Sequence, residues 1–162
     1  MKNALMIRPF CQSDAESLYK IENKIWNSNN TPVVIDYPTP QSYLQDHSSE
    51  NTIVALVNDL PVGSIEYHPA TSKPASKYTW TFGIGVSPDY QSDGIGSQLL
   101  EHFKKFAQKS GVHKIHLRAL GTNPGAIHFY QKHGFETEGI LKDEFFINGI
   151  FVADYQMAYF FD

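Results

Sequence analysis

The residues with the clearest chemical signature lie between Val86 and Leu100, where an apolar segment leads into two glycines and then into a helical pattern. Gly94 and Gly96 have no side chain, so backbone N–H groups there can approach a ligand closely. The start of a helix places about half a positive charge behind such a loop. The segment therefore predicts a site that holds an anionic, phosphate-bearing ligand through backbone amides.

The loop differs from the two best-known phosphate loops. Ser97 and Gln98 stand where a nucleotide P-loop needs Lys followed by Ser or Thr. Leu99 stands where a dinucleotide fingerprint needs its third glycine. The segment instead resembles the Gln/Arg-x-x-Gly-x-Gly/Ala motif of the GCN5-related N-acetyltransferases, with Gln91, Gly94 and Gly96 in its three diagnostic places.

A second segment resembles the same family. Asn123 and Ala126 lie at a predicted helix start, and Phe129-Tyr130 is followed by Gly134-Phe135 at the family's spacing. The resemblance implies an α/β (α+β) fold in one domain over residues 1–162, with a mixed sheet of about seven strands, a splayed parallel pair and flanking helices. The alternative is an ordinary α/β domain with a tight strand-to-helix turn and a capped helix.

The resemblance also implies acetyl-coenzyme A as cosubstrate. Its pyrophosphate would lie on the glycine loop and its pantetheine arm against the backbone of the preceding strand, which contains Gly83 and Gly85. The implied cofactor-binding residues are Ile84, Gly85, Val86, Gln91, Ser92, Asp93, Gly94, Ile95, Gly96, Ser97, Asn123, Ala126 and Tyr130.

The implied reaction is attack of a neutral amine on the acetyl thioester. A phenol has a pKa near ~10 and a thiol near ~8.5, so Tyr130, in the family's tyrosine position, can protonate the departing thiolate. Many relatives carry a glutamate on the strand before the glycine loop, where Trp80 stands in this chain. Glu66 is therefore the first candidate base, with His68 and Glu144 behind it and a water chain as the alternative.

Asp93 is a second departure from the family, because relatives often carry a basic residue there. An anionic side chain near a pyrophosphate opposes binding unless it faces solvent or pairs with a cation such as Lys104 or Lys105. Replacing Asp93 by Lys should therefore tighten acetyl-coenzyme A binding.

Composition excludes several classes of protein. The chain has 162 residues and a net charge of −4 with a pI near 5.9, so it lacks the basic field of a nucleic-acid-binding protein. Cys11 is the single cysteine, which rules out internal disulfides and a cysteine metal cluster.

The spacing of His102, His113, His116, His128 and His133 fits no familiar zinc pattern, and no metal is expected. No apolar run approaches about 18 residues, so we expect no membrane partner and a cytoplasmic location.

The pattern of apolar and turn residues predicts an alternating order of elements. The expected strands are Ala4–Arg8, Ile53–Val57, Val62–Tyr67, Tyr78–Val86, Ile115–Leu120, Ile140–Ile147 and Ile150–Tyr159. The expected helices are one that begins with a capping box at Ser13 and Glu16, and others at Gln41–His47, Ser97–Lys109 and Pro124–His133. A turn at Asn58-Asp59-Leu60-Pro61 and the Asn148-Gly149 turn are expected to form two hairpins.

Three functions fit these patterns. The first is acetyl-coenzyme A-dependent acetylation of a primary amine on a small molecule. The second is acetylation of protein or peptide N-termini, and the third is a non-catalytic coenzyme A-binding sensor. The resemblance and the aromatic C-terminal strands also allow a homodimer.

Overall fold

The computed structural model describes residues 4–162, which form two compact units. The described part of the first unit comprises residues 4–25, Ile35–His68 and Phe82–Ser110. The second comprises Trp26–Val34, Pro69–Thr81 and Gly111–Asp162. The expectation of one domain over residues 1–162 stays a prediction.

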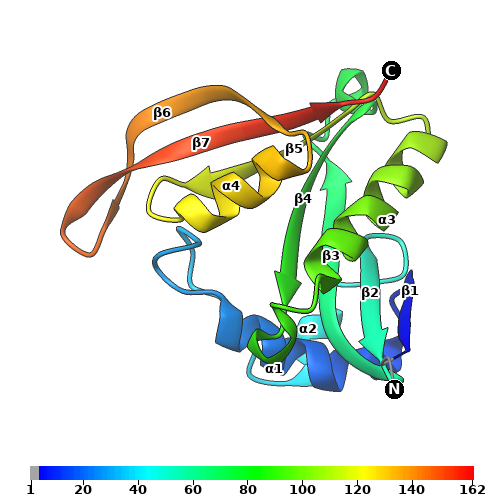
Figure 1. The fold of residues 1–162 in the computed structure, drawn as a ribbon. Coiled ribbons are helices and arrows are strands. Elements are labelled where there is room, and N and C mark those ends of the chain that lie inside the picture. Colours follow the sequence, from blue (N-terminus) through cyan, green and yellow to red (C-terminus); the bar gives the residue numbers. More distant parts are fainter. Residues whose placement is uncertain (1–3) are drawn as a thin grey trace. The chain divides into compact units, whose positions relative to one another are not determined.

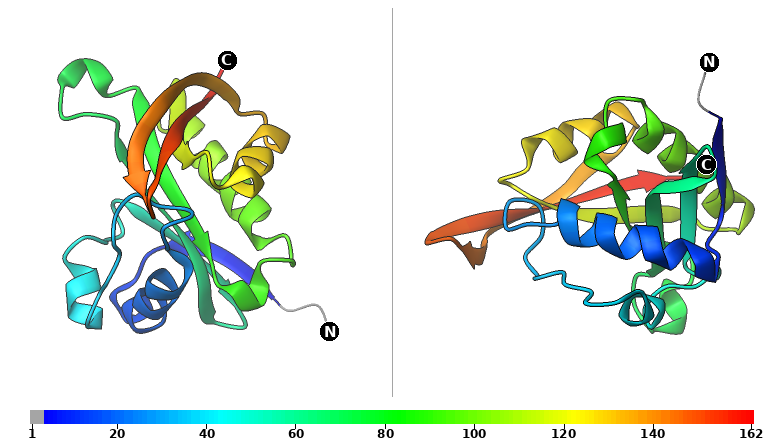
Figure 2. Two further views of the ribbon diagram at one scale, coloured as in Figure 1. Left: turned by 90° about the vertical axis from the view of Figure 1, so that its left-hand side faces the viewer. Right: turned by 90° about the horizontal axis from the view of Figure 1, so that it is seen from below.

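Three antiparallel strands and three helices make up most of the first unit. The strands are β1 (Leu5–Pro9), β2 (Thr52–Val57) and β3 (Leu60–Pro69), and the helices are α1 (Ala15–Ile25), α2 (Pro40–Leu44) and α3 (Ile95–Lys109). Helices α1 and α2 lie on one side of β2 and β3, and α3 lies on the other (Figure 2). Successive side chains of β3 therefore point alternately toward α3 and toward α1 and α2, because neighbouring side chains of a strand point to opposite faces.

Each face of these strands has its own apolar core. On the α3 side, the ring of Phe103 packs against those of Phe82 and Tyr67, with centroids 5.0 and 5.3 Å apart. On the α1 side, Leu18 and Tyr43 are fully buried in a cluster with Val54. Ser64 and Glu66 of β3 belong to this second face, because Ser64 and Glu66 contact side chains of α1 and of the segment after α2.

The start of α1 differs from the prediction. A capping box is present at Cys11 and Asp14 in place of the one expected at Ser13 and Glu16, and the Glu16 carboxylate accepts a hydrogen bond from Lys20. A short 3₁₀ turn, Gln12–Asp14, precedes α1, and the Asp14 carboxylate accepts from the backbone N–H of Cys11 at 2.8 Å. The same carboxylate accepts two hydrogen bonds from Arg8, which anchors the helix start to β1.

The turn between β2 and β3 is shorter than predicted. Asn58 and Asp59 both have positive φ, 49° and 67°, and Leu60 and Pro61 already belong to β3. Asn and Asp tolerate the left-handed conformation that a two-residue hairpin turn requires. The prediction of a hairpin is confirmed, and its four-residue turn is wrong.

The second unit contains the C-terminal strands. Residues Thr79–Thr81 of β4 (Thr79–Val86) pair in parallel with Lys114–His116 of β5 (Lys114–Leu120). Strand β5 pairs with β7 (Ile150–Phe160), which pairs with β6 (Glu136–Ile147), both antiparallel. Helix α4 (Pro124–Lys132) lies beside these strands (Figure 1). The residues after it, Gly134 and Phe135, pack against Tyr159 of β7.

The seven strands are hydrogen-bonded in the order β1-β2-β3-β4-β5-β7-β6, with one parallel pair. Strand β4 belongs to both units, because the second includes its residues up to Thr81 and the first begins again at Phe82. The C-terminal hairpin turns at Asn148 and Gly149, whose φ values are 51° and 80°. The predicted mixed sheet with flanking helices and the predicted Asn-Gly hairpin are both confirmed.

Candidate functional site

The glycine loop of the first unit connects β4 to α3. Gly94 adopts a left-handed conformation with φ 73° and stands immediately before α3, which begins at Ile95, two residues earlier than predicted. Ser92, Asp93 and Gly94 are exposed, whereas Ile95 is buried and anchors the helix start. The first four N–H groups of a helix have no partner within it, so the amides from Ile95 onward suit an anionic ligand.

Gln91 ties the loop to the strand before it. Its side-chain Nε2 donates to the carbonyl oxygen of Val86 at 3.1 Å. The backbone N–H of Asp93 donates to Tyr90 O at 3.3 Å, which closes the turn before Gly94. The motif glutamine thus fixes the loop conformation here, a role that the sequence pattern alone did not predict.

The carboxylate of Asp93 is exposed, and no ion pair joins it to another of residues 4–162. Lys104, one of its predicted partners, donates to Glu101 at 3.1 Å on the same helix. Asp93 therefore contributes a negative charge to the surface of the loop.

Strand β4 packs closely against α1 at Gly85. A Cβ placed on Gly85 would lie 2.3 Å from Cδ1 of Ile25 and 3.6 Å from Oε1 of Glu22. A Cβ on Gly83 would meet nothing within 4 Å. Close helix packing thus explains Gly85 without a ligand, whereas the backbone at Gly83 lies open.

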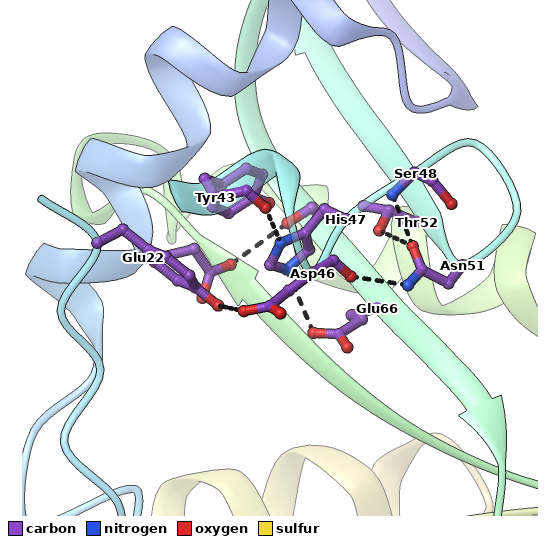
Figure 3. A network of polar contacts seen from close by, with 10 residues as sticks. Glu22, Tyr43, Asp46, His47, Ser48, Asn51, Thr52 and Glu66 are labelled. Carbon is purple, nitrogen blue, oxygen red and sulfur yellow. Dashed lines mark hydrogen bonds and ion pairs between the residues drawn. The ribbon is translucent and has the colours of Figure 1, made fainter. Parts of the chain in front are cut away.

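Glu66, the predicted base, forms an ion pair that the sequence did not reveal. Its Oε2 lies 3.2 Å from Nε2 of His47, whose side chain is almost fully buried (Figure 3). The other ring nitrogen, Nδ1, lies 2.9 Å from the carbonyl oxygen of Tyr43. Both ring nitrogens therefore face acceptor oxygens.

This geometry favours the protonated form of His47. A neutral imidazole has one N–H donor, whereas the imidazolium has two and can donate both to Glu66 and to Tyr43 O. Burial opposes the charge on His47, but the hydrogen bonds to Glu66 and to Tyr43 O outweigh it, and the pKa of His47 is raised above its ordinary value.

Tyrosines and further carboxylates surround this pair. The hydroxyl of Tyr37 donates to Asp46 at 3.3 Å, and the ring of Tyr43 stacks on that of His47 at 3.8 Å. Burial and the carboxylates of Asp46, Glu66 and Glu22 raise the pKa of Tyr37. Ser64 Oγ donates to Glu22 Oε1 at 3.4 Å (Figure 3). Glu22 and His47 were not predicted, because they are separated in sequence from the glycine motif and from each other.

The second unit carries the other predicted residues. Asn123 caps α4, since its Oδ1 accepts from the backbone N–H of Ala126 at 3.3 Å. Tyr130 is buried between the rings of Phe129 and Phe135, and burial raises its pKa. Tyr130 is therefore a neutral phenol, the form that can donate a proton.

The remaining candidates for the base differ in their surroundings. His68 is exposed near the end of β3. Glu144 lies 3.9 Å from Arg118, which also donates to the buried Asp154. Trp80 pairs with Ile115 in the parallel register of β4 and β5.

Within residues 4–162, no group of three or more His, Cys, Asp or Glu side chains is placed to hold a metal ion. No helix in this described part of the chain is long and apolar enough to cross a membrane.

Comparison with known proteins shows the family. The family model described as Acetyltransferase (GNAT) family matches residues 15–135, which is more than half of the chain. The chain therefore belongs to the GNAT family of acetyltransferases.

Two curated relatives show the range of acceptors in similar proteins. Spermidine N(1)-acetyltransferase of Vibrio cholerae serotype O1 is 38% identical over 69 residues, which are 42% of this chain and 40% of that protein. The [Ribosomal protein bS18]-alanine N-acetyltransferase of Escherichia coli K12 is 39% identical over 62 residues, 38% of this chain and 42% of that protein. The chain thus matches about two fifths of the length of these relatives.

Solved structures share the fold over nearly the whole chain. The protein smu.2055 of Streptococcus mutans UA159 has a TM-score of 0.88 and 34% identity, covering 96% of this chain and 98% of its own. The yncA protein of Salmonella typhimurium, solved with its cofactor acetyl-CoA, has a TM-score of 0.84 and 20% identity, covering 99% and 95%. The second likeness concerns the fold alone.

Proposed function

We propose that this protein transfers the acetyl group of acetyl-coenzyme A to a primary amine of a small molecule by direct attack. The observation that carries the proposal is the exposed loop at Gly94, which is left-handed and opens directly into a 15-residue helix. Backbone amides at such a helix start suit a pyrophosphate. Family membership makes acetyl-coenzyme A the cosubstrate of choice.

The proposed cofactor contacts follow from these positions. The pyrophosphate would accept from amides between Ser92 and Ser97, and the pantetheine arm would hydrogen-bond the backbone of Ile84–Val86. Asn123 and Ala126 would contribute to cofactor binding at the start of α4, where Asn123 accepts a hydrogen bond from the N–H of Ala126. No metal takes part in this proposal.

The reaction balances without another reactant. The acceptor ammonium loses one proton to a base, and the neutral nitrogen then bonds to the acetyl carbonyl carbon. The C–S bond breaks with its electron pair on sulfur, and the nitrogen loses its second proton. Tyr130, a neutral phenol, would supply the proton that converts the thiolate to the thiol, and it would regain a proton afterwards.

A polar, acidic environment favours a cationic small amine as acceptor. Glu22, Asp46 and Glu66 all contribute to the negative field at Tyr37. Such a field attracts ammonium groups. The relative that acetylates spermidine provides a precedent for this class of acceptor.

A second candidate is acetylation of protein N-termini, which the relative named for ribosomal protein bS18 supports. The third candidate, a coenzyme A sensor without turnover, has less support because a binding module needs no acid at Tyr130.

The experiment is coenzyme A release from acetyl-coenzyme A with polyamines, amino acids, aminoglycosides and short peptides, alongside a control without amine. We expect release with a small amine. Preference for peptides would shift the function to N-terminal acetylation, and binding without release would favour the sensor. In Tyr130→Phe we expect turnover to fall by roughly 10²- to 10⁴-fold with acetyl-coenzyme A binding retained, and unchanged turnover would remove the acid role.

We also propose a cytoplasmic location and a homodimer. Cys11 is a free, exposed thiol, which suits a reducing compartment. Phe146 and Phe151 are exposed and pack together on the β6–β7 hairpin, with ring centroids 5.1 Å apart, and a second copy could cover them. Light scattering of the wild type and of Phe151→Ser tests the dimer, since a monomeric wild type contradicts it.

A further inference from the structure

The strand β4 that leads to the glycine loop carries no acidic side chain, so a carboxylate that takes the proton of the acceptor amine would come from another element. Two carboxylates lie on the same face of the first unit, those of Glu22 on α1 and Glu66 on β3. Their surroundings differ in what each carboxylate contacts and in how close it lies to β4.

Glu66 is already engaged with the buried ring of His47. Its Oε2 lies 3.2 Å from Nε2 of His47, whose Nδ1 lies 2.9 Å from Tyr43 O. Glu66 therefore contacts a buried ring that is fixed at both nitrogens. This arrangement suits a structural ion pair better than a group that exchanges protons with substrate.

Glu22 lies directly beside β4. Its Oε1 would be 3.6 Å from a Cβ on Gly85, so no side chain of that residue separates the carboxylate from the strand backbone. Gly83, two residues earlier on the same face, has open space where a side chain would be. The half-buried Glu22 carboxylate thus lies beside β4 at Gly85, and the uncovered Gly83 follows two residues away on the strand that would hold the pantetheine arm.

The carboxylate of Glu22 is also held in place. Ser64, which is buried on β3, donates to Oε1 at 3.4 Å. The pKa values of Tyr37, Tyr43 and His47 are all raised, and the negative charge of Glu22 contributes to each of these shifts. Glu66 lies two residues from Ser64 on the same strand face. The hydroxyl of Ser64 therefore orients the carboxylate of Glu22.

We infer that Glu22, rather than Glu66, is the catalytic base that accepts the first proton of the acceptor ammonium, with Ser64 as its positioning residue. The inference rests on the proposed function. The transferred proton moves from nitrogen to the Glu22 carboxylate, which leaves the neutral amine to attack the thioester, and Glu22 returns the proton to solvent after the product leaves.

The test compares three glutamine variants of the full chain, Glu22→Gln, Glu66→Gln and Glu16→Gln, with the best amine of the panel. Glu16 is the matched control, because it lies on the same helix and bonds only the exposed Lys20 in the contacts described. We expect Glu22→Gln to lower kcat at neutral pH by roughly 10²- to 10⁴-fold with little change in the KM for acetyl-coenzyme A. The loss should shrink as the pH approaches about 10, because the free amine then loses its proton to solvent.

Ser64→Ala provides a second variant that keeps every charge of the face. It should lower kcat less than Glu22→Gln does, with the same rise toward alkaline pH. Circular dichroism and acetyl-coenzyme A titration of each variant show whether the fold and the cofactor site are intact.

Two results overturn the inference. One is turnover in Glu22→Gln at the wild-type level, and the other is a loss of the same size at every pH, which would indicate a structural role. If the wild type releases no coenzyme A with any amine of the panel, the proposed function fails and the inference fails with it. If only Glu66→Gln is impaired, the proposed function stands and Glu66 is the base.

Discussion

His47 and Glu66 form an ion pair in which Nε2 and Oε2 lie 3.2 Å apart, with the histidine side chain 3% exposed and the glutamate side chain 43% exposed. The carbonyl of Tyr43 accepts from the other ring nitrogen. The pair anchors the segment after α2 to the middle of β3. Because His47 is buried and its pKa is raised by these contacts, we expect the stability of the first unit to depend on pH.

The pKa of His47 is raised in the folded protein, so protonated His47 stabilises the fold. This contribution is fully present below the unfolded pKa near ~6.5 and is lost as the pH rises through the higher folded pKa. We expect the free energy of unfolding to fall across that interval. Urea unfolding at a series of pH values measures it.

The matched variant for this prediction is Glu66→Gln, which removes the negative partner and keeps the side-chain size. The pKa of His47, followed by NMR of its ring protons, should then move down toward or below its ordinary value. An unchanged pKa would show that Tyr43 O and the rest of the field, rather than Glu66, hold the proton.

A side chain at Gly85 should displace the end of the Ile25 side chain. A Cβ there would lie 2.3 Å from Cδ1 of Ile25, so Gly85→Ala forces Ile25 into another rotamer. Because Cδ1 is the end of a flexible side chain, we expect a loss near the lower end of the about 1–3 kcal/mol of unfolding free energy that overpacking costs. Gly83→Ala, where the added carbon meets nothing within 4 Å, is the control. Because Ile25→Val shortens the opposing side chain, it should restore part of the loss, and no restoration would place the strain elsewhere.

Arg8 should contribute to stability through Asp14. The Asp14 side chain is 3% exposed and accepts from both terminal nitrogens of Arg8, at 2.7 and 2.9 Å. Arg8→Ala would leave a buried carboxylate with its bond to the Cys11 N–H alone, at a cost of about 1–3 kcal/mol. Thermal or urea unfolding measures the loss. Lys20→Ala breaks the exposed pair with Glu16 and should change stability much less, so equal losses would contradict the role of burial.

Asp93 should weaken binding of acetyl-coenzyme A, because its exposed carboxylate adds negative charge to the loop beside Gly94. Asp93→Lys should tighten binding by a few-fold, on the order of 1 kcal/mol for a charge in water near the phosphates. Added salt should reduce the gain. Titration calorimetry at low and high salt measures both effects, with Asp89→Lys, an exposed position in the preceding turn, as the control. Unchanged or weaker binding would place Asp93 away from the ligand.

Most of the secondary structure could be predicted from local sequence. The Asn148-Gly149 turn, the strand-to-helix loop at Gly94 and the helix start at Asn123 all appear where the residue types indicated. The boundaries were less accurate: α3 begins at Ile95 rather than Ser97, and the hairpin turn is Asn58-Asp59 alone. The hydrogen bonds of Asp14 at the start of α1 include those from Arg8 on β1, a partner outside the helix.

The candidate site has a backbone part, the glycine loop, and a part made of side chains. The sequence by itself determined the glycine loop, because residue type governs which backbone conformations are accessible and where side chains are absent. The tertiary structure decided the side-chain part, since packing of α1 and α2 on β3 brought Glu22, His47, Ser64 and Glu66 together from distant segments. Those contacts arise because apolar faces of distant segments are buried against each other. The local sequence around each residue does not specify which partner this packing brings within hydrogen-bonding distance.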